Sequence, residues 1–275
     1  DELLAFAPLG AELVLEIDMA RLRENSDEGK HIASIADFSL DPGHWNDPTR
    51  DHDHVVFCAY TLSTAEPDTL TQFKSERLSA IAGAQRLAPG IVAIGSKAMR
   101  KRALATKDGA SPSMTTDRAF FVVRDRAVPE EAPGATLRVT AAFDFDARVS
   151  MARMFDLDRV PTSVSIWGDV VDDLAIVALL TAEGKRESQA LARASQKTLA
   201  RTAQHPWVRR LVLGYLLESV VVKASTTDAR LVLLVDPHRL ELLSKRLTRY
   251  AREAGEAARL PSDNKPNQPQ TSPES

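Results

Sequence analysis

Three segments of this chain share one pattern, in which an apolar strand ends in an aspartate and a helix starts directly after it. Leu13–Asp18 precedes Met19–Glu24, Leu137–Asp144 precedes Ala147–Phe155, and Leu231–Asp236 precedes Pro237–Tyr250. Aspartate is a strong N-cap because its carboxylate accepts hydrogen bonds from the free N–H groups of the first helical turn. We therefore interpret Asp18, Asp144 and Asp236 as helix caps rather than as catalytic carboxylates.

The second half of the chain predicts the order β-α-β-β-α-α-β-β-α. Its two hairpins, over 163–180 and 220–235, require antiparallel neighbours. Along the first hairpin, Trp167 and Ile166 are expected on opposite sides of the sheet. The fold class that follows is α+β, with antiparallel-rich sheets and helices packed on one face.

The first half is a looser version of the same order, which predicts a duplicated unit. Strand and helix cannot be separated over 69–87 from periodicity alone. The run Pro129–Gly134 is the best internal boundary, so we divide the chain into halves at 1–130 and 134–258. Residues 260–275 are rich in proline and polar side chains, and we expect this tail to be disordered.

Composition places few limits on the compartment. No apolar run approaches the roughly 18 residues of a membrane span. The chain starts at Asp1 rather than at methionine, so we expect a leader upstream and a periplasmic or lipid-anchored protein; otherwise it is cytoplasmic. The single cysteine, Cys58, lies in an apolar strand-like run and is expected to be a buried, inert thiol.

The net charge of −3 hides an asymmetry along the chain. Residues 1–53 carry 13 acidic and 4 basic side chains, whereas the remaining 222 residues carry 25 acidic and 31 basic ones. The basic side chains are densest in Lys97–Lys107 and Lys185–Arg210. No aromatic residues interleave them, and the pI near 6.1 is low for a nucleic-acid-binding protein, so we expect no nucleic-acid partner.

The loop that leads into the strand at 55–61 contains the strongest candidates for metal ligands. His44, Asp51, His52, Asp53 and His54 are of the residue types that zinc uses, and in a strand His52 and His54 would project to one side together. The spacing matches no established metal-binding motif, and the loop is rich in proline. We therefore favour a solvated loop and expect no metal and no cofactor.

Two other apparent motifs have structural explanations. Asp169, Asp172 and Asp173 are interpreted as turn residues of the first hairpin. The run Gly90–Lys97 resembles a phosphate-binding loop, but its serine precedes the lysine and its middle is a buried strand.

Three stretches carry a resemblance to a known group of proteins. They are the opening Leu3–Arg23, the run Phe145–Val149 and the run Val164–Ala175, in a chain where Arg outnumbers Lys 25 to 10. The chain resembles the uncharacterised predicted lipoproteins of myxobacterial type over most of residues 3–251. The resemblance implies a secreted or lipid-anchored α+β protein and assigns no catalytic residue.

Three functions stay open at this point. The first is a non-enzymatic envelope or periplasmic interaction protein, with a protein partner and an oligomeric state that the sequence does not give. The second is a metal-dependent hydrolase that uses His44, His52, His54 and Asp51 or Asp53, and the third is a cytoplasmic polyanion-binding module. For the first, the apolar helix-like segment 207–217 is expected to be buried in the core, because it is apolar on nearly all sides; if Trp207 and Tyr215 are instead exposed together, they are the candidate docking residues.

Overall fold

A computed structural model gives the structure of the protein. It describes residues 2–25, 27, 29–30, 33, 52–64, 66–74, 84–131, 134–154, 157–171, 173–210, 213–243, 245–246 and 249. The statements below concern these residues. The expected tail at 260–275 lies outside them.

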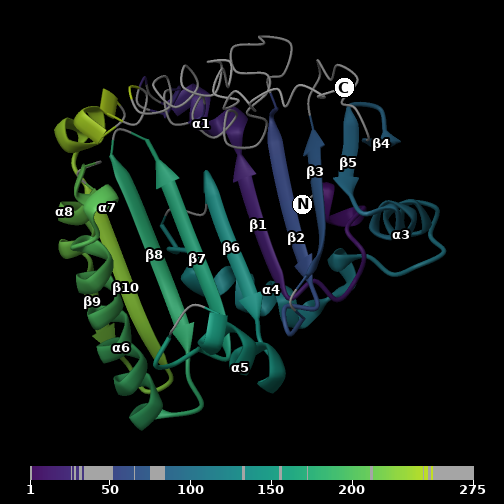
Figure 1. Cartoon of the computed structure of the whole chain (residues 1–275). Coiled ribbons are helices and arrows are strands. Elements are labelled where there is room, and N and C mark those ends of the chain that lie inside the picture. The colour runs from purple at the N-terminus through teal and green to yellow at the C-terminus, as the bar shows by residue number, and fades with distance from the viewer. Residues whose placement is uncertain are drawn as a thin grey trace, which may run out of the picture.

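One sheet of ten strands runs through the whole described chain (Figure 1). Its order from edge to edge is β4-β5-β3-β2-β1-β6-β7-β8-β10-β9, and every neighbouring pair is antiparallel. The strands are β1 (Leu13–Asp18), β2 (His54–Tyr60), β3 (Asp68–Lys74), β4 (Gln85–Ala88), β5 (Ile91–Gly95), β6 (Leu137–Ala142), β7 (Ser163–Val170), β8 (Leu174–Thr181), β9 (Val221–Ala224) and β10 (Asp228–Val235). The predicted α+β fold with antiparallel pairing is confirmed.

Helices connect the strands and border the sheet. The α-helices are α1 (Met19–Asn25), α3 (Lys97–Lys107), α4 (Arg118–Arg124), α5 (Phe145–Met154), α6 (Lys185–Ala203), α7 (Pro206–Arg210) and α8 (Leu213–Glu218), and residues 237–243 are also helical. Short 3-10 helices are η1 (Leu3–Ala5), η4 (Met114–Thr116) and η5 (Asp125–Ala127). Within the described ranges, no helix combines the length and the apolar character that crossing a membrane requires.

All three aspartates predicted as caps do cap helices. The Arg21 N–H donates to Asp18 Oδ1 at 2.8 Å, the Ala147 N–H to Asp144 Oδ1 at 2.8 Å, and the Arg239 N–H to Asp236 Oδ1 at 3.0 Å. Each carboxylate thus satisfies one of the N–H groups that a helix start leaves without a partner.

Both predicted hairpins are present, with the expected register. In the β7–β8 pair, Trp167 lies opposite Val177 and Ile166 opposite Ala178. Trp167 is 4% exposed and its indole N–H donates to the Gly134 carbonyl at 2.7 Å, whereas Ile166 on the other side of the sheet is half-buried. The ambiguous stretch 69–87 contains the end of β3 and the start of β4, on either side of undescribed residues.

The two faces of the sheet are covered differently. On one face, here called the covered face, Val14, Cys58 and Leu70 pack with Met99 of α3 and Phe120 of α4 in one buried cluster. The other is called the open face. There α6 packs beside β8–β10, α5 lies against the lower end of β1–β2, and α1 with residues 237–243 lies against the upper end. The prediction placed helices on one face; they cover that face and also border the other.

The two halves have the same strand order when counted outward from the central pair. From β1 the order is β1-β2-β3-β5-β4, and from β6 it is β6-β7-β8-β10-β9. β1 pairs with β6, with Leu15 opposite Val139, so the boundary near 129–134 separates two halves of one sheet.

Removal of a cap tests the role assigned to the aspartates. Asp144→Ala should lower the free energy of unfolding by about 1 kcal/mol because the first turn of α5 loses its acceptor. Urea unfolding followed by circular dichroism measures this change. Asp144→Ser, which keeps an acceptor, is the control, and equal losses in both variants would contradict the capping role.

Candidate functional site

A charged cleft of about 480 Å³ lies between β1, β2, β6 and the N-terminal residues. Leu3, Leu4, Val55 and Val56 supply apolar walls. Its charged lining residues are Glu2, Glu16, Asp18, Arg21, His54, Lys74, Arg124 and Arg138. The cleft thus brings eight titratable side chains around one cavity.

The centre of the cleft is a buried ion pair between β1 and α4. Arg124 Nε donates to Glu16 Oε1 at 2.6 Å and Arg124 Nη2 donates to Glu16 Oε2 at 2.8 Å, and the two side chains are only 10% and 14% exposed. A bidentate pair of this kind fixes both side chains in position. Its main consequence is that α4 is held on the covered face.

A second bidentate pair connects α1 to the end of β7. Arg21 donates to both oxygens of Asp169, at 2.9 and 2.7 Å, and this hydrogen bonding raises the pKa of Arg21. The Arg21 guanidinium lies against Gly134, where an added Cβ would be 2.7 Å from its central carbon. Asp169 was predicted to be a turn residue; instead it lies within β7, is 6% exposed, and holds a partner 148 positions away.

Two further cations of the cleft are also paired. Lys74 Nζ donates to Glu2 Oε2 at 2.6 Å, and Arg138 Nη1 donates to Asp125 Oδ1 at 3.2 Å. Burial lowers the pKa of Arg138, and the neighbouring Arg124 guanidinium lowers it further. Glu2 and Glu16 are engaged with cations and Asp18 accepts from the Arg21 backbone N–H, so these carboxylates are poorly placed to act as general bases.

The histidines of the candidate metal loop do not converge. The His52 ring packs on Phe73, with 4.6 Å between ring centroids, whereas His54 Nδ1 lies 3.6 Å from Asp18 Oδ1 in the cleft. The chain bends at Asp53 and the strand begins only at His54, so the prediction that both imidazoles share one side of a strand is wrong. His44 and Asp51 lie outside the described residues.

No group of three or more His, Cys, Asp or Glu side chains suited to a metal ion occurs within the described ranges. Asp53 connects neighbouring segments through its backbone. Its N–H donates to the Lys74 carbonyl at 2.7 Å, and its carbonyl accepts from the Ala20 N–H at 3.0 Å.

Cys58 is buried in the covered face, as expected. Burial raises the pKa of its thiol to about 12. The thiolate, which is the nucleophilic form, is therefore scarce at neutral pH.

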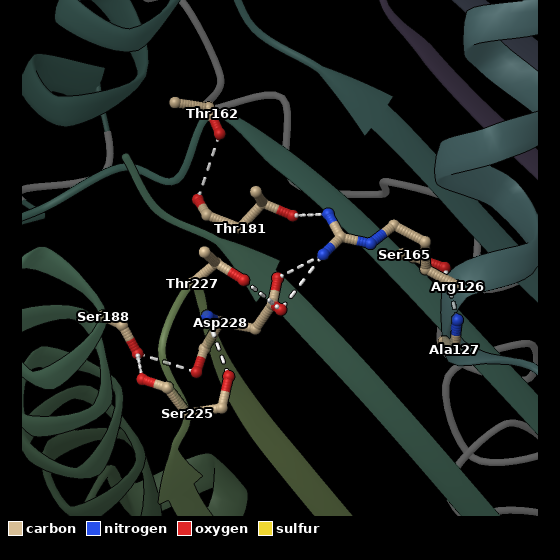
Figure 2. Close-up of polar contacts among 9 residues, drawn as sticks. All are labelled: Arg126, Ala127, Thr162, Ser165, Thr181, Ser188, Ser225, Thr227 and Asp228. Carbon is tan, nitrogen blue, oxygen red and sulfur yellow. Dashed lines mark hydrogen bonds and ion pairs between the residues drawn. The ribbon is translucent and has the colours of Figure 1, made fainter. Parts of the chain in front are cut away.

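A second polar network lies at the lower end of the sheet and has a structural role. Figure 2 shows Arg126 reaching from η5 to Asp228, with N–O distances of 2.9 and 3.0 Å, and to Thr181 Oγ1 at 2.6 Å. Ser188 of α6 donates to the Asp228 carbonyl at 2.7 Å and is also within hydrogen-bonding reach of the Ser225 carbonyl. The network therefore joins η5, β8, β10 and α6.

The two basic stretches lie at opposite edges of the sheet. Lys97–Lys107 forms α3 next to β5, whereas Lys185–Arg210 contributes α6 and α7 next to β10 and β9 (Figure 1). A polyanion that contacted both would have to cross all ten strands.

Tyr215 lies on the surface in α8. It is 49% exposed, and the Arg239 guanidinium lies 4.8 Å from the centre of its ring. Beside it is a groove of about 190 Å³ lined by Leu216, Leu242, Leu243, Arg239 and Arg246. The backbone of Trp207 belongs to α7, and its side chain lies outside the described part of the structure.

Comparison with known proteins identifies no relative by sequence. No family profile matches the chain, and no curated protein matches it. Among solved structures it is similar to TP0453, in a structure described as crystal form I of that protein, with a TM-score of 0.40 and 10% identity over 88% of this chain and 96% of the other. A likeness at this level supports no conclusion about activity.

Disruption of the central ion pair tests its contribution to the fold. Glu16→Gln should lower the free energy of unfolding by about 2 kcal/mol, because the buried Arg124 cation loses its counter-charge. The double variant Glu16→Gln/Arg124→Met should lose less than the single variant, because it carries no uncompensated charge. Urea titration of Glu16→Gln, Arg124→Met and the double variant at neutral pH measures these losses. A double variant whose loss equals the sum of the Glu16→Gln and Arg124→Met losses would contradict the pairing.

The buried thiol makes a second prediction. Cys58 should not react with a maleimide at pH 8 in the native protein, because it is both inaccessible and protonated. It should react fully once the protein is unfolded in urea. Rapid native labelling, followed by mass spectrometry, would show that the covered face is open around β2.

Proposed function

We propose that this chain is a non-enzymatic interaction protein of the bacterial envelope. Six of the eight titratable side chains of its charged cleft are engaged in ion pairs, and its one thiol is buried. The observation that carries the proposal is the groove beside Tyr215, where large apolar side chains are exposed on a surface helix.

The groove has the composition of a small docking site. Tyr215 and Leu242 are 49% and 46% exposed, while Leu216 and Leu243 form a buried apolar base at 8% exposure each. Aromatic residues and arginine are enriched where binding energy concentrates in protein interfaces.

The charges around the groove indicate the chemistry of the partner. Arg239 and Arg246 line it, and none of its described lining residues is a carboxylate. Arg239 also pairs with Asp236 at 3.1 Å, which holds its guanidinium over the Tyr215 ring. The partner is therefore a protein segment with an apolar side chain that enters the groove and a carboxylate that meets an arginine.

The envelope location is part of the proposal and is supported by the resemblance to predicted lipoproteins in the segments quoted above. A full-length gene with a lipobox or a signal-cleavage site upstream of Asp1 would support it. A cytoplasmic protein without any leader would contradict it.

We also propose that the two halves derive from one duplicated unit. The support is their shared outward strand order and the position of a helix directly after β1 and β6.

A photo-crosslinker at position 215 tests the docking proposal in cells that produce the protein. We expect a discrete adduct whose cross-linked peptide contains an apolar residue beside Asp or Glu. The adduct should be lost when Leu242→Ala and Arg239→Ala are added, while the thermal midpoint changes by less than about 2 °C, as for other surface substitutions.

The matched control carries the crosslinker at position 234, which is 64% exposed on β10. The same adducts from both positions would overturn the proposal. A large drop in the thermal midpoint of the Tyr215→Ala variant would mean that this helix serves the core instead.

A further inference from the structure

The open face of the sheet has an apolar surface whose middle no described helix covers. In Figure 1 the middles of β6, β7 and β8 are seen with no described helix in front of them, whereas α6 lies along β9 and β10 and packs against Ala229 and Leu180. Side chains alternate between the faces of a strand, so every second residue of these strands belongs to this surface. The register places them in three rows across β1, β6, β7, β8 and β10, here called the apolar floor.

All fifteen positions of the apolar floor lack polar side chains. The upper row is Ile17, Leu137, Gly168, Ile176 and Leu233; the middle row is Leu15, Val139, Ile166, Ala178 and Leu231; the lower row is Leu13, Ala141, Val164, Leu180 and Ala229. Every residue of the middle row is half-buried, and in the described part of the chain none of them packs against a buried cluster.

This composition is the reverse of what an exposed antiparallel face normally has. A solvated face of such a sheet carries polar side chains, and the apolar residues lie on the packed face. Here the covered face contains Glu16, Arg138, Thr140 and Ser165 of the same strands, while the open face contains only aliphatic residues and glycine. The apolar floor therefore has the composition of a surface that is covered.

The size and shape of the floor argue against a second copy of the chain. Five strands at about 4.8 Å and three rows about 7 Å apart give at most roughly 19 by 14 Å, and outer-row residues such as Leu13, Leu180 and Ala229 already pack against the bordering helices. A stable protein interface needs about 800 Å² from each partner, which is nearly three times this area. In addition, α6, α5 and α1 border the floor and would hold a second sheet away from it.

The chemistry of the floor favours an aliphatic chain over a peptide. Binding hot spots for proteins are enriched in Trp, Tyr and Arg, and Leu and Val are under-represented there. An extended peptide would also need backbone partners, but the backbone groups of these inner strands are already paired with one another. An acyl chain needs neither aromatic and arginine contacts nor backbone partners.

A cation lies at the lower border of the floor. Arg148 extends from α5 to Glu183, just after β8, with Nη2 at 3.2 Å from Glu183 Oε1. This contact crosses the lower ends of β6 and β7, beside the lower row of the floor. Arg148 Nε has no acceptor in the described structure, and the side chain as a whole is 23% exposed beside Glu183, so an anionic group that reaches the guanidinium can supply the acceptor that Nε lacks.

We propose that the apolar floor binds the aliphatic tail of a long-chain carboxylate, with its head group at Arg148. The inference stands apart from the docking groove at Tyr215, and neither depends on the other. The free energy of binding comes from apolar surface that leaves water. The orientation comes from the Arg148 guanidinium, which lies at the lower border of a floor without polar side chains.

Displacement of cis-parinaric acid, a fluorescent long-chain fatty acid, tests this proposal on the whole chain. Palmitate should displace it, and shortening the competitor should weaken binding about fourfold for each CH₂ that leaves the floor. Ile166→Glu, at the centre of the middle row, should weaken binding at least tenfold. Ala178→Phe, which adds bulk without charge, provides a second floor variant if Ile166→Glu does not fold.

The control is Val122→Glu, because Val122 is 68% exposed on α4 at the other face. It should bind like the wild type. Arg148→Met should weaken palmitate about tenfold and leave hexadecanol, which has no charge, unchanged.

Three results would overturn the proposal. The first is a wild-type protein that does not bind cis-parinaric acid. The second is equal binding by the floor variants and Val122→Glu, and the third is an equal effect of Arg148→Met on palmitate and hexadecanol. A wild-type dimer that Ile166→Glu converts to monomer, without fatty-acid binding, would show that a second copy covers the floor.

Discussion

The antiparallel pairing of β1 with β6 is the interaction on which the rest of the structure depends. These two strands lie at the middle of the sheet, and each begins one half of the chain. Their register places Glu16 and Arg138 side by side on the covered face and Leu15 and Val139 side by side on the open face. A shift by one residue would exchange the two sets, bury the charges under the wrong helices and divide the apolar floor.

The two faces use this pairing in different ways. On the covered face, the Glu16–Arg124 pair holds α4, and a buried cluster surrounds Cys58 and Met99. On the open face, helices pack at the borders and leave the middle rows without a described partner. The interactions that stabilise the fold are thus concentrated on the covered face. The open face leaves an aliphatic surface for a ligand.

The elements that sequence reasoning predicted well depend on local chemistry. Asp18, Asp144 and Asp236 cap helices within three residues, and the hairpins follow from short connections between alternating strands. What it missed depends on contacts between distant residues. Asp169 looked like a turn residue because its partner Arg21 is 148 positions away, and the two His side chains separate because the chain bends at Asp53. The apolar floor was also missed, since alternation indicates that a strand has two faces but does not show which face a helix covers. The segment that contains Tyr215 was expected to be buried, with docking as the alternative, and the 49% exposure of Tyr215 is what the sequence could not give.

Native-state hydrogen exchange of the backbone amides in β1 and β6 tests the central claim, that one continuous sheet unites the two halves. If the strands pair as described, their amides should be among the slowest to exchange and should open only with global unfolding. Amides of β1 and β6 that exchange faster than those of β3 and β8, in halves that unfold separately, would contradict the account.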